Sequence, residues 1–316
     1  MEEKKLAVVL KGLKKYFPGT KALDWKENDK IEIYAGEIHG LVGENGAGKS
    51  TTFQILMGIY DMTGGEISLF GKDYKPANVH EAEEAGISII MQQPNFAYNL
   101  SVAENIFMGQ DKRFTNKFGL IDWKKQNEAA AEILKKCKYD NIKPTDILSD
   151  LGYEETKQVE IARALSSNPK VLLVDETSAA ISKTSVESLY ALLRELAAKG
   201  CAVIYISHFI DEVYALCDRV SILRDGKLIT KMEINENVNS DIIIKNMVGR
   251  DVSLESYRSE DQSSIKDVMF ELKGYSKQGS FHDIDMTVRS GEIVGIAGLG
   301  GCGSEALGKA IFGYEP

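Results

Sequence analysis

Short apolar segments alternate along the chain with segments whose apolar residues recur at helical spacing. Strand-length apolar segments cover residues 36–43, 171–174 and 202–206, and helical spacing covers residues 51–59 and 184–198. Strands of a parallel sheet are apolar along their whole length because helices cover both faces of the sheet. The alternation therefore predicts an α/β fold with a parallel core sheet.

A more polar helical region interrupts this alternation. Ser101 and Glu104 have the spacing of a capping box, and helical spacing continues with interruptions to Cys137. We therefore predict a helical subdomain at about residues 95–157. Further along the chain, the pair Asp225 and Gly226 separates two apolar runs, which predicts a hairpin turn.

A repeat begins at residue 290. Residues 35–48 align without gaps on residues 290–303 with seven identical positions, and the same offset places Gly58 on Gly313. The repeat predicts a second copy of the strand, turn and helix. We divide the chain into a first domain at 1–250, a polar linker at 251–268 and an N-terminal fragment of a second domain at 269–316, which we expect to be too short to complete its own sheet.

Charge and hydropathy exclude several classes of protein. The 316 residues carry a formal net charge of -9, whereas nucleic-acid-binding surfaces are normally basic, so we expect no nucleic acid partner. No apolar run approaches the roughly 20 residues that cross a bilayer. The charged first residues also lack the apolar run of a signal peptide. These features predict a cytoplasmic protein.

The segment Gly43-Glu-Asn-Gly-Ala-Gly-Lys-Ser50 matches the phosphate-binding P-loop pattern and lies between a predicted strand and a predicted helix. Its glycines let backbone N–H groups turn toward phosphates, and the helix N-terminus adds positive potential. We expect Lys49 to bind terminal phosphates and the Ser50 hydroxyl to ligate Mg²⁺. The predicted ATP-binding segment consists of Gly43, Glu44, Asn45, Gly46, Ala47, Gly48, Lys49, Ser50 and Thr51.

Two adjacent acids, Asp175 and Glu176, follow the apolar run at residues 171–174. In open α/β sheets, ligands bind at the carboxyl ends of the strands. We expect Asp175 to hold Mg²⁺, directly or through water. Glu176 is the predicted general base that orients and polarises the water attacking a γ-phosphate.

With these motifs the sequence resembles the ATP-binding cassette (ABC) ATPases, in particular the double-cassette subunits of monosaccharide importers, over almost the whole chain. The resemblance implies a P-loop NTPase fold with a parallel core sheet, an antiparallel β-subdomain and a helical subdomain. It also implies three site residues. Phe17 would stack on adenine, and His208 would contact the γ-phosphate. Gln92, with Gln93 as the alternative register, would sense Mg²⁺ and water and face the membrane subunits.

The sequence departs from the family at the signature, the segment that contacts the nucleotide of an opposing cassette. Counting back from Val159, the LSGGQ-type signature falls on a segment that lacks the serine and the second glycine: Leu151, Gly152, Tyr153, Glu154 and Glu155. Glu154 would bring a negative charge toward a phosphate, which is unfavourable. A second register on residues 148–152 keeps Ser149 but breaks the spacing to Val159.

The second P-loop copy departs as well, because Ser304 aligns with Lys49 and Glu305 with Ser50. In the family, each of two composite sites combines one cassette's P-loop with the other cassette's signature. Both defects fall in the same composite site. We therefore expect one inactive site and one competent site, the latter completed by a second signature outside these 316 residues. We interpret Thr177 and residues 179–182, which also differ from the family, as neutral.

The resemblance thus implies an ATP-hydrolysing subunit, using ATP and Mg²⁺, that drives import of a monosaccharide or similar solute from the cytoplasmic face of a membrane. Its implied partners are permease subunits, indirectly an extracytoplasmic solute-binding protein, and a second cassette in the same polypeptide or a dimer. Two alternatives stay open. One is a nucleotide-binding module with little turnover of its own. The other is a soluble double-cassette protein acting on ribosomes or DNA, although such proteins usually have a long basic helical linker.

Overall fold

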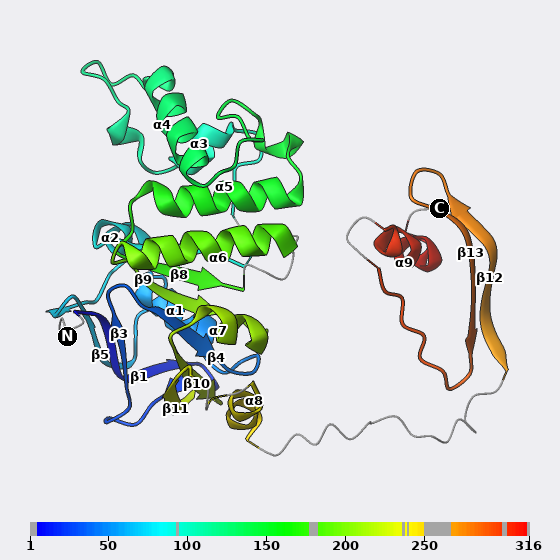
Figure 1. Ribbon diagram of the computed structural model, residues 1–316, viewed down its shortest axis with the longest axis horizontal. Helices are drawn as coiled ribbons and strands as arrows, with labels where there is room; N and C mark the ends of the chain where they lie inside the picture. The colour runs from blue at the N-terminus through cyan, green and yellow to red at the C-terminus, as the bar shows by residue number, and fades with distance from the viewer. Residues whose placement is uncertain are drawn as a thin grey trace. The chain divides into compact units, whose positions relative to one another are not determined.

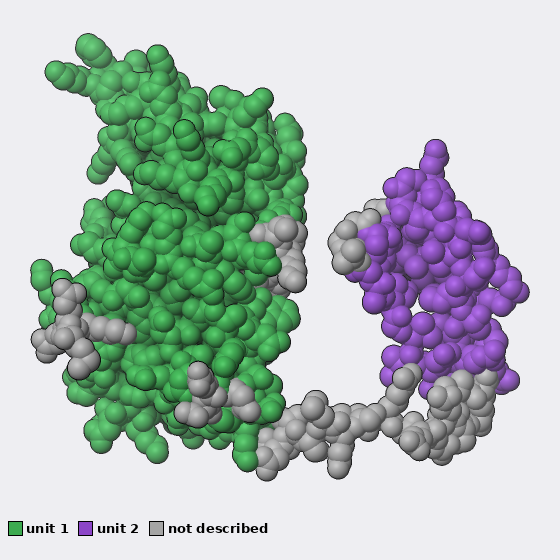
Figure 2. All heavy atoms as spheres, viewed as in Figure 1, with its two compact units in different colours: residues 1–252 green, residues 253–316 purple. Residues whose placement is uncertain are grey.

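A computed structural model describes residues 5–92, 95–176, 183–235, 238, 240–249, 267–298 and 302–314 of the chain (Figure 1). The chain divides into two compact units, residues 1–252 and residues 253–316 (Figure 2). Most of the predicted linker, together with Gln93, Thr177 and residues 179–182, lies outside the described residues.

The first unit is built on a six-stranded sheet with the strand order β11-β10-β4-β9-β8-β7. Its strands are β4 (Ile38–Val42), β7 (Ile87–Ile90), β8 (Val171–Asp175), β9 (Ala202–Ile206), β10 (Arg219–Arg224) and β11 (Lys227–Glu233). All neighbours are parallel except β11, which forms the predicted hairpin with β10. Asp225 and Gly226 both have positive φ, 50° and 72°, as a type I′ turn requires.

Both faces of this sheet are buried, which explains the continuous apolar runs. In β8, Leu172 and Val174 belong to one core, whereas Val171 and Leu173 belong to the other. The first core also involves α3 (Val102–Ile106), α4 (Trp123–Lys136), α5 (Tyr153–Ser166), α6 (Lys183–Ala198), α7 (Ile210–Leu216) and α8 (Ser240–Val248). The second involves α1 (Lys49–Leu56), α2 (Val79–Glu84) and an antiparallel sheet of β1 (Leu6–Phe17), β2 (Thr20–Asp24), β3 (Lys30–Tyr34), β5 (Gly64–Leu69) and β6 (Lys72–Asp73). The predicted fold class is thus confirmed.

One predicted helix start is confirmed, and one predicted helix has other boundaries. The predicted capping box is present, because Ser101 and Glu104 each accept a hydrogen bond from the other's backbone N–H. However, α1 spans Lys49–Leu56 rather than residues 51–59, and Gly58, at φ 68°, follows its end. Helix α5 continues past residue 157, so one helix contacts both the polar helical region and β7 of the core. Across the described ranges, no helix is long and apolar enough to cross a membrane.

The second unit contains a hairpin of β12 (Val268–Lys277) and β13 (Phe281–Arg289), followed by α9 (Ser304–Phe312). The repeat predicted a copy of the strand at residues 36–43, which the offset of 255 places at residues 291–298, and this prediction is wrong. A strand is stabilised by hydrogen bonds to neighbouring strands, and β4 obtains these from β9 and β10. Among the described residues of the second unit, no strand takes the place of β9 or β10.

Candidate functional site

The P-loop connects the carboxyl end of β4 to the N-terminus of α1. Gly46 and Gly48 have φ values of 81° and 102°, in the left-handed region that favours glycine. At Gly43, an added Cβ would overlap the backbone carbonyl oxygen of Leu223 on β10. These three glycines therefore allow the chain to turn sharply and to pass close to β10 between β4 and α1.

Lys49 lies inside this turn and is 5% exposed. Its Nζ donates hydrogen bonds to the carbonyl oxygens of Gly43, at 2.8 Å, and Glu44, at 3.1 Å. Burial lowers the pKa of Lys49, and the nearby charges of Glu176 and Asp175 oppose this shift. The ammonium group is thus fixed in the loop close to two acids, where it can bind a polyanion.

The two acids lie at the carboxyl end of β8. Asp175 is its last residue and pairs in register with Ile206 of β9. Burial, together with the neighbouring charge of Glu176, raises the pKa of Asp175 to about 6, although Lys49 opposes the shift. Glu176 has φ 40°, and its backbone N–H donates to the Ile206 carbonyl oxygen at 3.0 Å. A non-glycine residue in this conformation is strained, as residues at functional sites often are.

Three predicted catalytic residues meet at one oxygen atom. Gln92 Nε2 donates to Glu176 Oε2 at 2.9 Å, and His208 Nδ1 lies 3.4 Å from the same oxygen. The three residues follow β7, β8 and β9, which are adjacent in the sheet and parallel. Their carboxyl ends therefore bring together residues that are far apart in the sequence.

The oxygen donors of the site fit Mg²⁺ that is bound together with phosphates. Mg²⁺ commonly takes one or two carboxylates and hydroxyls from the protein, with phosphate oxygens and water completing its shell. Asp175 and Ser50, at the start of α1, are donors of this kind. Over the described ranges, no group of three or more His, Cys, Asp or Glu side chains could hold a metal ion by itself.

Phe17, the residue proposed to stack on adenine, ends β1. Its ring packs edge-on against Tyr60, with 5.1 Å between the ring centroids. Lys15 Nζ lies 4.9 Å from the centroid of Phe17 and 5.2 Å from that of Tyr60. Sequence reasoning missed Tyr60, which orients Phe17 and follows the predicted P-loop helix directly.

The favoured signature register falls at the N-terminus of α5, and the second register includes a short 3-10 helix, Leu148–Asp150. Glu155 Oε2 accepts from the Gly152 backbone N–H at 2.9 Å, and Glu154 accepts from the hydroxyl of Ser185 on α6. Both carboxylates therefore have partners within their own unit.

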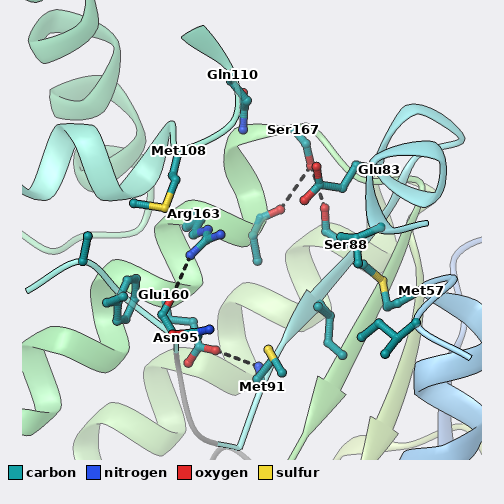
Figure 3. A pocket seen from close by; sticks show the side chains of 16 residues that line it. Met57, Glu83, Ser88, Met91, Asn95, Met108, Gln110, Glu160, Arg163 and Ser167 are labelled. Atoms are coloured by element: carbon teal, nitrogen blue, oxygen red, sulfur yellow. Dashed lines mark hydrogen bonds between the residues drawn. The ribbon is translucent and has the colours of Figure 1, made fainter.

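A buried ion pair on α5, Lys157 with Glu160, was also missed. Lys157 Nζ lies 2.8 Å from Glu160 Oε2 and donates to the carbonyl oxygens of Met91 and Gln92, the latter at 3.2 Å. Glu160 Oε1 accepts from the Met91 backbone N–H at 2.7 Å (Figure 3). The sequence held one signal of this pair, which is a Lys and a Glu three residues apart within a mainly apolar helical run.

Comparison with known proteins agrees with this geometry. Residues 27–179 match the family model described as ABC transporter. The chain is 38% identical to a ribose import ATP-binding protein of Bacillus cereus, over 98% of this chain and 61% of that protein. It is 37% identical to a fructose import ATP-binding protein of Bifidobacterium longum, over 100% of this chain and 61% of that protein. The chain thus spans about 60% of the length of these curated relatives.

Solved structures give the same result for the fold. A nucleotide-free ATP-binding cassette from an ABC transporter aligns with a TM-score of 0.66 at 25% identity, covering 81% of this chain and all of that chain. A cassette in an ADP conformation aligns with a TM-score of 0.65 at 25% identity, covering 78% of this chain and 99% of the other.

Proposed function

Because this chain contains an ATP-binding cassette of the ABC transporter family, we propose that it is the ATP-hydrolysing subunit of an importer for a monosaccharide or similar small solute. The observation that carries the proposal is the convergence of Gln92 and His208 on Glu176 Oε2, beside the P-loop. The named relatives support the transport role, since both are import ATP-binding proteins.

Each site residue then has a distinct task. Lys49 and the P-loop N–H groups bind the β- and γ-phosphates, and Phe17 stacks on adenine. Glu176 accepts a hydrogen bond from the attacking water and polarises it, while Gln92 and His208 fix the position of its carboxylate. Ser50, Asp175 and Gln92 would hold Mg²⁺, whose charge would offset the negative charge that develops on the phosphate oxygens.

Steady-state phosphate release from Mg-ATP, with ATP binding measured on the same samples, tests this proposal. We expect the chain to bind Mg-ATP, the substitution Lys49→Ala to weaken this binding, and turnover to depend on Glu176. Binding without turnover would favour the nucleotide-binding module, the second candidate, which the hydrogen-bonded carboxylates of Glu154 and Glu155 also favour. Absence of ATP binding would exclude both candidates.

We also propose that permease subunits dock, at the cytoplasmic face of the membrane, on the groove beside the segment that carries Gln92. A cavity of about 480 Å³ opens there between the end of β7, α2 and α5 (Figure 3). Its lining includes four apolar side chains that are each 38–45% exposed: Ile59, Val79, Met91 and Met108. The charged residues of the lining are Glu83, Glu160 and Arg163, which are two acids and one base.

Polar substitution of the lining tests this docking surface. We expect the double variant I59S/V79S to lose co-purification with co-expressed permease subunits, because docking would bury these side chains. Phe118→Ser is the matched control, since Phe118 is 88% exposed and lies outside this lining. Equal capture of I59S/V79S and wild type would contradict the docking surface without affecting the ATPase proposal.

A further inference from the structure

The ammonium group of Lys157 is enclosed by oxygen atoms from two segments. Its Nζ donates hydrogen bonds to the carbonyl oxygens of Met91 and Gln92, and Glu160 Oε2, its ion-pair partner, lies 2.8 Å away. The side chain of Lys157 is 2% exposed and that of Glu160 is 7% exposed. Removing both charges from water is unfavourable unless each has good partners. The pair therefore holds the backbone at residues 91–92 in one defined position.

Two further hydrogen bonds join α5 to the same segment. Glu160 Oε1 accepts from the Met91 backbone N–H at 2.7 Å, and Arg163 Nη1 donates to the Asn95 carbonyl oxygen at 3.1 Å (Figure 3). Charged side chains at residues 157, 160 and 163 thus hold the chain both before and after residues 93–94.

The held backbone belongs to the residue that contacts the predicted general base. Gln92 carries one of the carbonyl oxygens bound by Lys157, and its side chain donates to Glu176 Oε2. We propose that Lys157 and Glu160, here called the α5 clamp, are positioning residues that set Gln92 for its role toward the Mg²⁺-bound nucleotide. The inference rests on the proposed function of the site.

The packing of α5 does not rest on this ion pair alone. The helix already buries Val159, Ile161, Ala162 and Ala164, and it contacts α3, α4 and β7. Replacing a buried ion pair with apolar side chains of similar volume is often neutral or stabilising. The specific effect of the charges is therefore on the segment that they hold, which makes the clamp separable from folding.

The experiment removes both charges at once in the full chain. The variant K157M/E160M leaves no unpaired buried charge, and K199M/E195M is its control. The control removes an exposed ion pair, 2.6 Å apart, between Glu195 on α6 and Lys199 just after the end of that helix. For each variant, titration with a fluorescent ATP analogue is done with Mg²⁺ and with EDTA, and the urea midpoint is measured in parallel.

We expect Gln92→Ala to lose the Mg²⁺-dependent part of the affinity, on the order of tenfold, the scale of residues next to metal ligands. K157M/E160M should lose the same part and keep an affinity in EDTA close to wild type. It should still unfold cooperatively in urea, although its midpoint falls because the Met91 backbone groups lose their partners. The triple variant Q92A/K157M/E160M should bind no more weakly than Gln92→Ala, because the effects of residues that act through the same group do not add. The control should match wild type.

Other results would overturn the α5 clamp. It would be contradicted if K157M/E160M lost affinity equally with Mg²⁺ and with EDTA, or if the folded variant bound ATP as wild type does. It would also be contradicted if Q92A/K157M/E160M bound more weakly than Gln92→Ala. Unchanged Mg²⁺ dependence in Gln92→Ala would contradict it as well, and this result leaves the proposed function intact. Failure of the proposed function is recognised separately, because wild type would then bind no ATP or Lys49→Ala would have no effect.

A second variant covers the case in which K157M/E160M does not fold. In K157Q/E160Q, the amide at 157 can still donate to a carbonyl oxygen and the amide at 160 can still accept from Met91 N–H. We expect this variant to keep part of the Mg²⁺ dependence. A loss as complete as that of Gln92→Ala, with a wild-type affinity in EDTA, would show that the charges are essential. Full loss of both affinities would contradict the clamp.

Discussion

The two copies of the P-loop segment share their local structure. Glu37 Oε2 accepts from the Tyr34 backbone N–H, and Glu292 Oε2 accepts from the Arg289 backbone N–H, both at 2.8 Å. Each copy starts its helix after a glycine in the left-handed region, with φ values of 102° and 89°, and later passes through a second such glycine, with φ values of 68° and 77°. A few neighbouring residues therefore determine these turns and helix starts.

The surroundings of the two copies differ completely. Ile38 is 3% exposed between β9 and β10, whereas Ile293, at the aligned position, is 98% exposed. Lys49 is buried beside the acids of β8, whereas the aligned Ser304 begins a helix whose Glu305 pairs with Lys309 at 2.8 Å. A strand and a catalytic site thus depend on distant segments, which the motif itself does not supply.

The largest expected effect concerns Glu176, the predicted general base beside the P-loop of the first copy. Glu176→Gln should keep ATP binding but lower turnover by roughly 10² to 10⁴, because the amide is a poor general base. Phosphate release under saturating Mg-ATP measures this. The matched control is Glu305→Gln in the second copy, which should leave turnover unchanged. Normal turnover in Glu176→Gln would remove Glu176 as the base.

The next effect tests the motif itself. Lys49→Ala should weaken Mg-ATP binding by about 2 to 3 kcal/mol, the scale of hydrogen bonds to charged groups. The reciprocal variant S304K/E305S restores the motif residues of the second copy, yet it should add no second binding site. Calorimetric titration counts the sites. A second site of similar affinity would show that the loop alone is sufficient for ATP binding. It would contradict the view that the site depends on distant segments.

Two glycine-to-alanine substitutions, one in each copy, test how closely each loop is packed. Gly43→Ala should lower the free energy of unfolding by about 1 to 3 kcal/mol, since the added Cβ overlaps a backbone carbonyl oxygen of β10. Gly298→Ala, at the aligned position, meets only the Cys302 side chain and should cost less than about 0.5 kcal/mol. Urea unfolding compares the two, and equal losses would contradict the difference in packing.

The smallest effect is a pH dependence confined to the first copy. His39 is hydrogen-bonded to Glu37 and Ser221, each at 2.8 Å, and burial lowers its pKa. Arg219 and Lys231 act in the same direction, while Glu37 opposes them.

The sign of the effect follows from this lowered pKa. Below about pH 6.5, the unfolded chain binds a proton that the folded His39 resists, so stability falls as the pH falls from about 6.5. His39→Val introduces the residue found at the aligned position 294 and should flatten the change in urea midpoint between about pH 7 and pH 5. An unchanged slope would assign the titration to another group.

Much of the fold was predictable because it depends on local pattern. The runs at 171–174 and 202–206 became β8 and β9, and Ser101 and Asp225 mark a helix start and a turn. The strand that the repeat predicted at residues 291–298 is absent, because a strand needs hydrogen-bonding neighbours and no described residues of the second unit provide them.

The same limit applies to the site. Motifs identified the P-loop and the acids, and the resemblance to a known family supplied Gln92 and His208. The α5 clamp could not be derived in this way, because its contacts join a helix to backbone atoms from a segment more than 60 residues earlier. Every residue except proline has the same backbone N–H and carbonyl groups, so the sequence does not show which of them a side chain will bind.

The order of strands in the core sheet has a consequence during translation. β4 leaves the ribosome long before β9 and β10, its two neighbours in the sheet, which begin at Ala202 and Arg219. At about 5 to 20 residues per second, this delay is on the order of ten seconds. During that interval the nascent chain presents an apolar segment without a partner, much as residues 292–298 do in the second unit. A chaperone at the ribosome exit would therefore find its target in the very strand that carries the phosphate-binding turn.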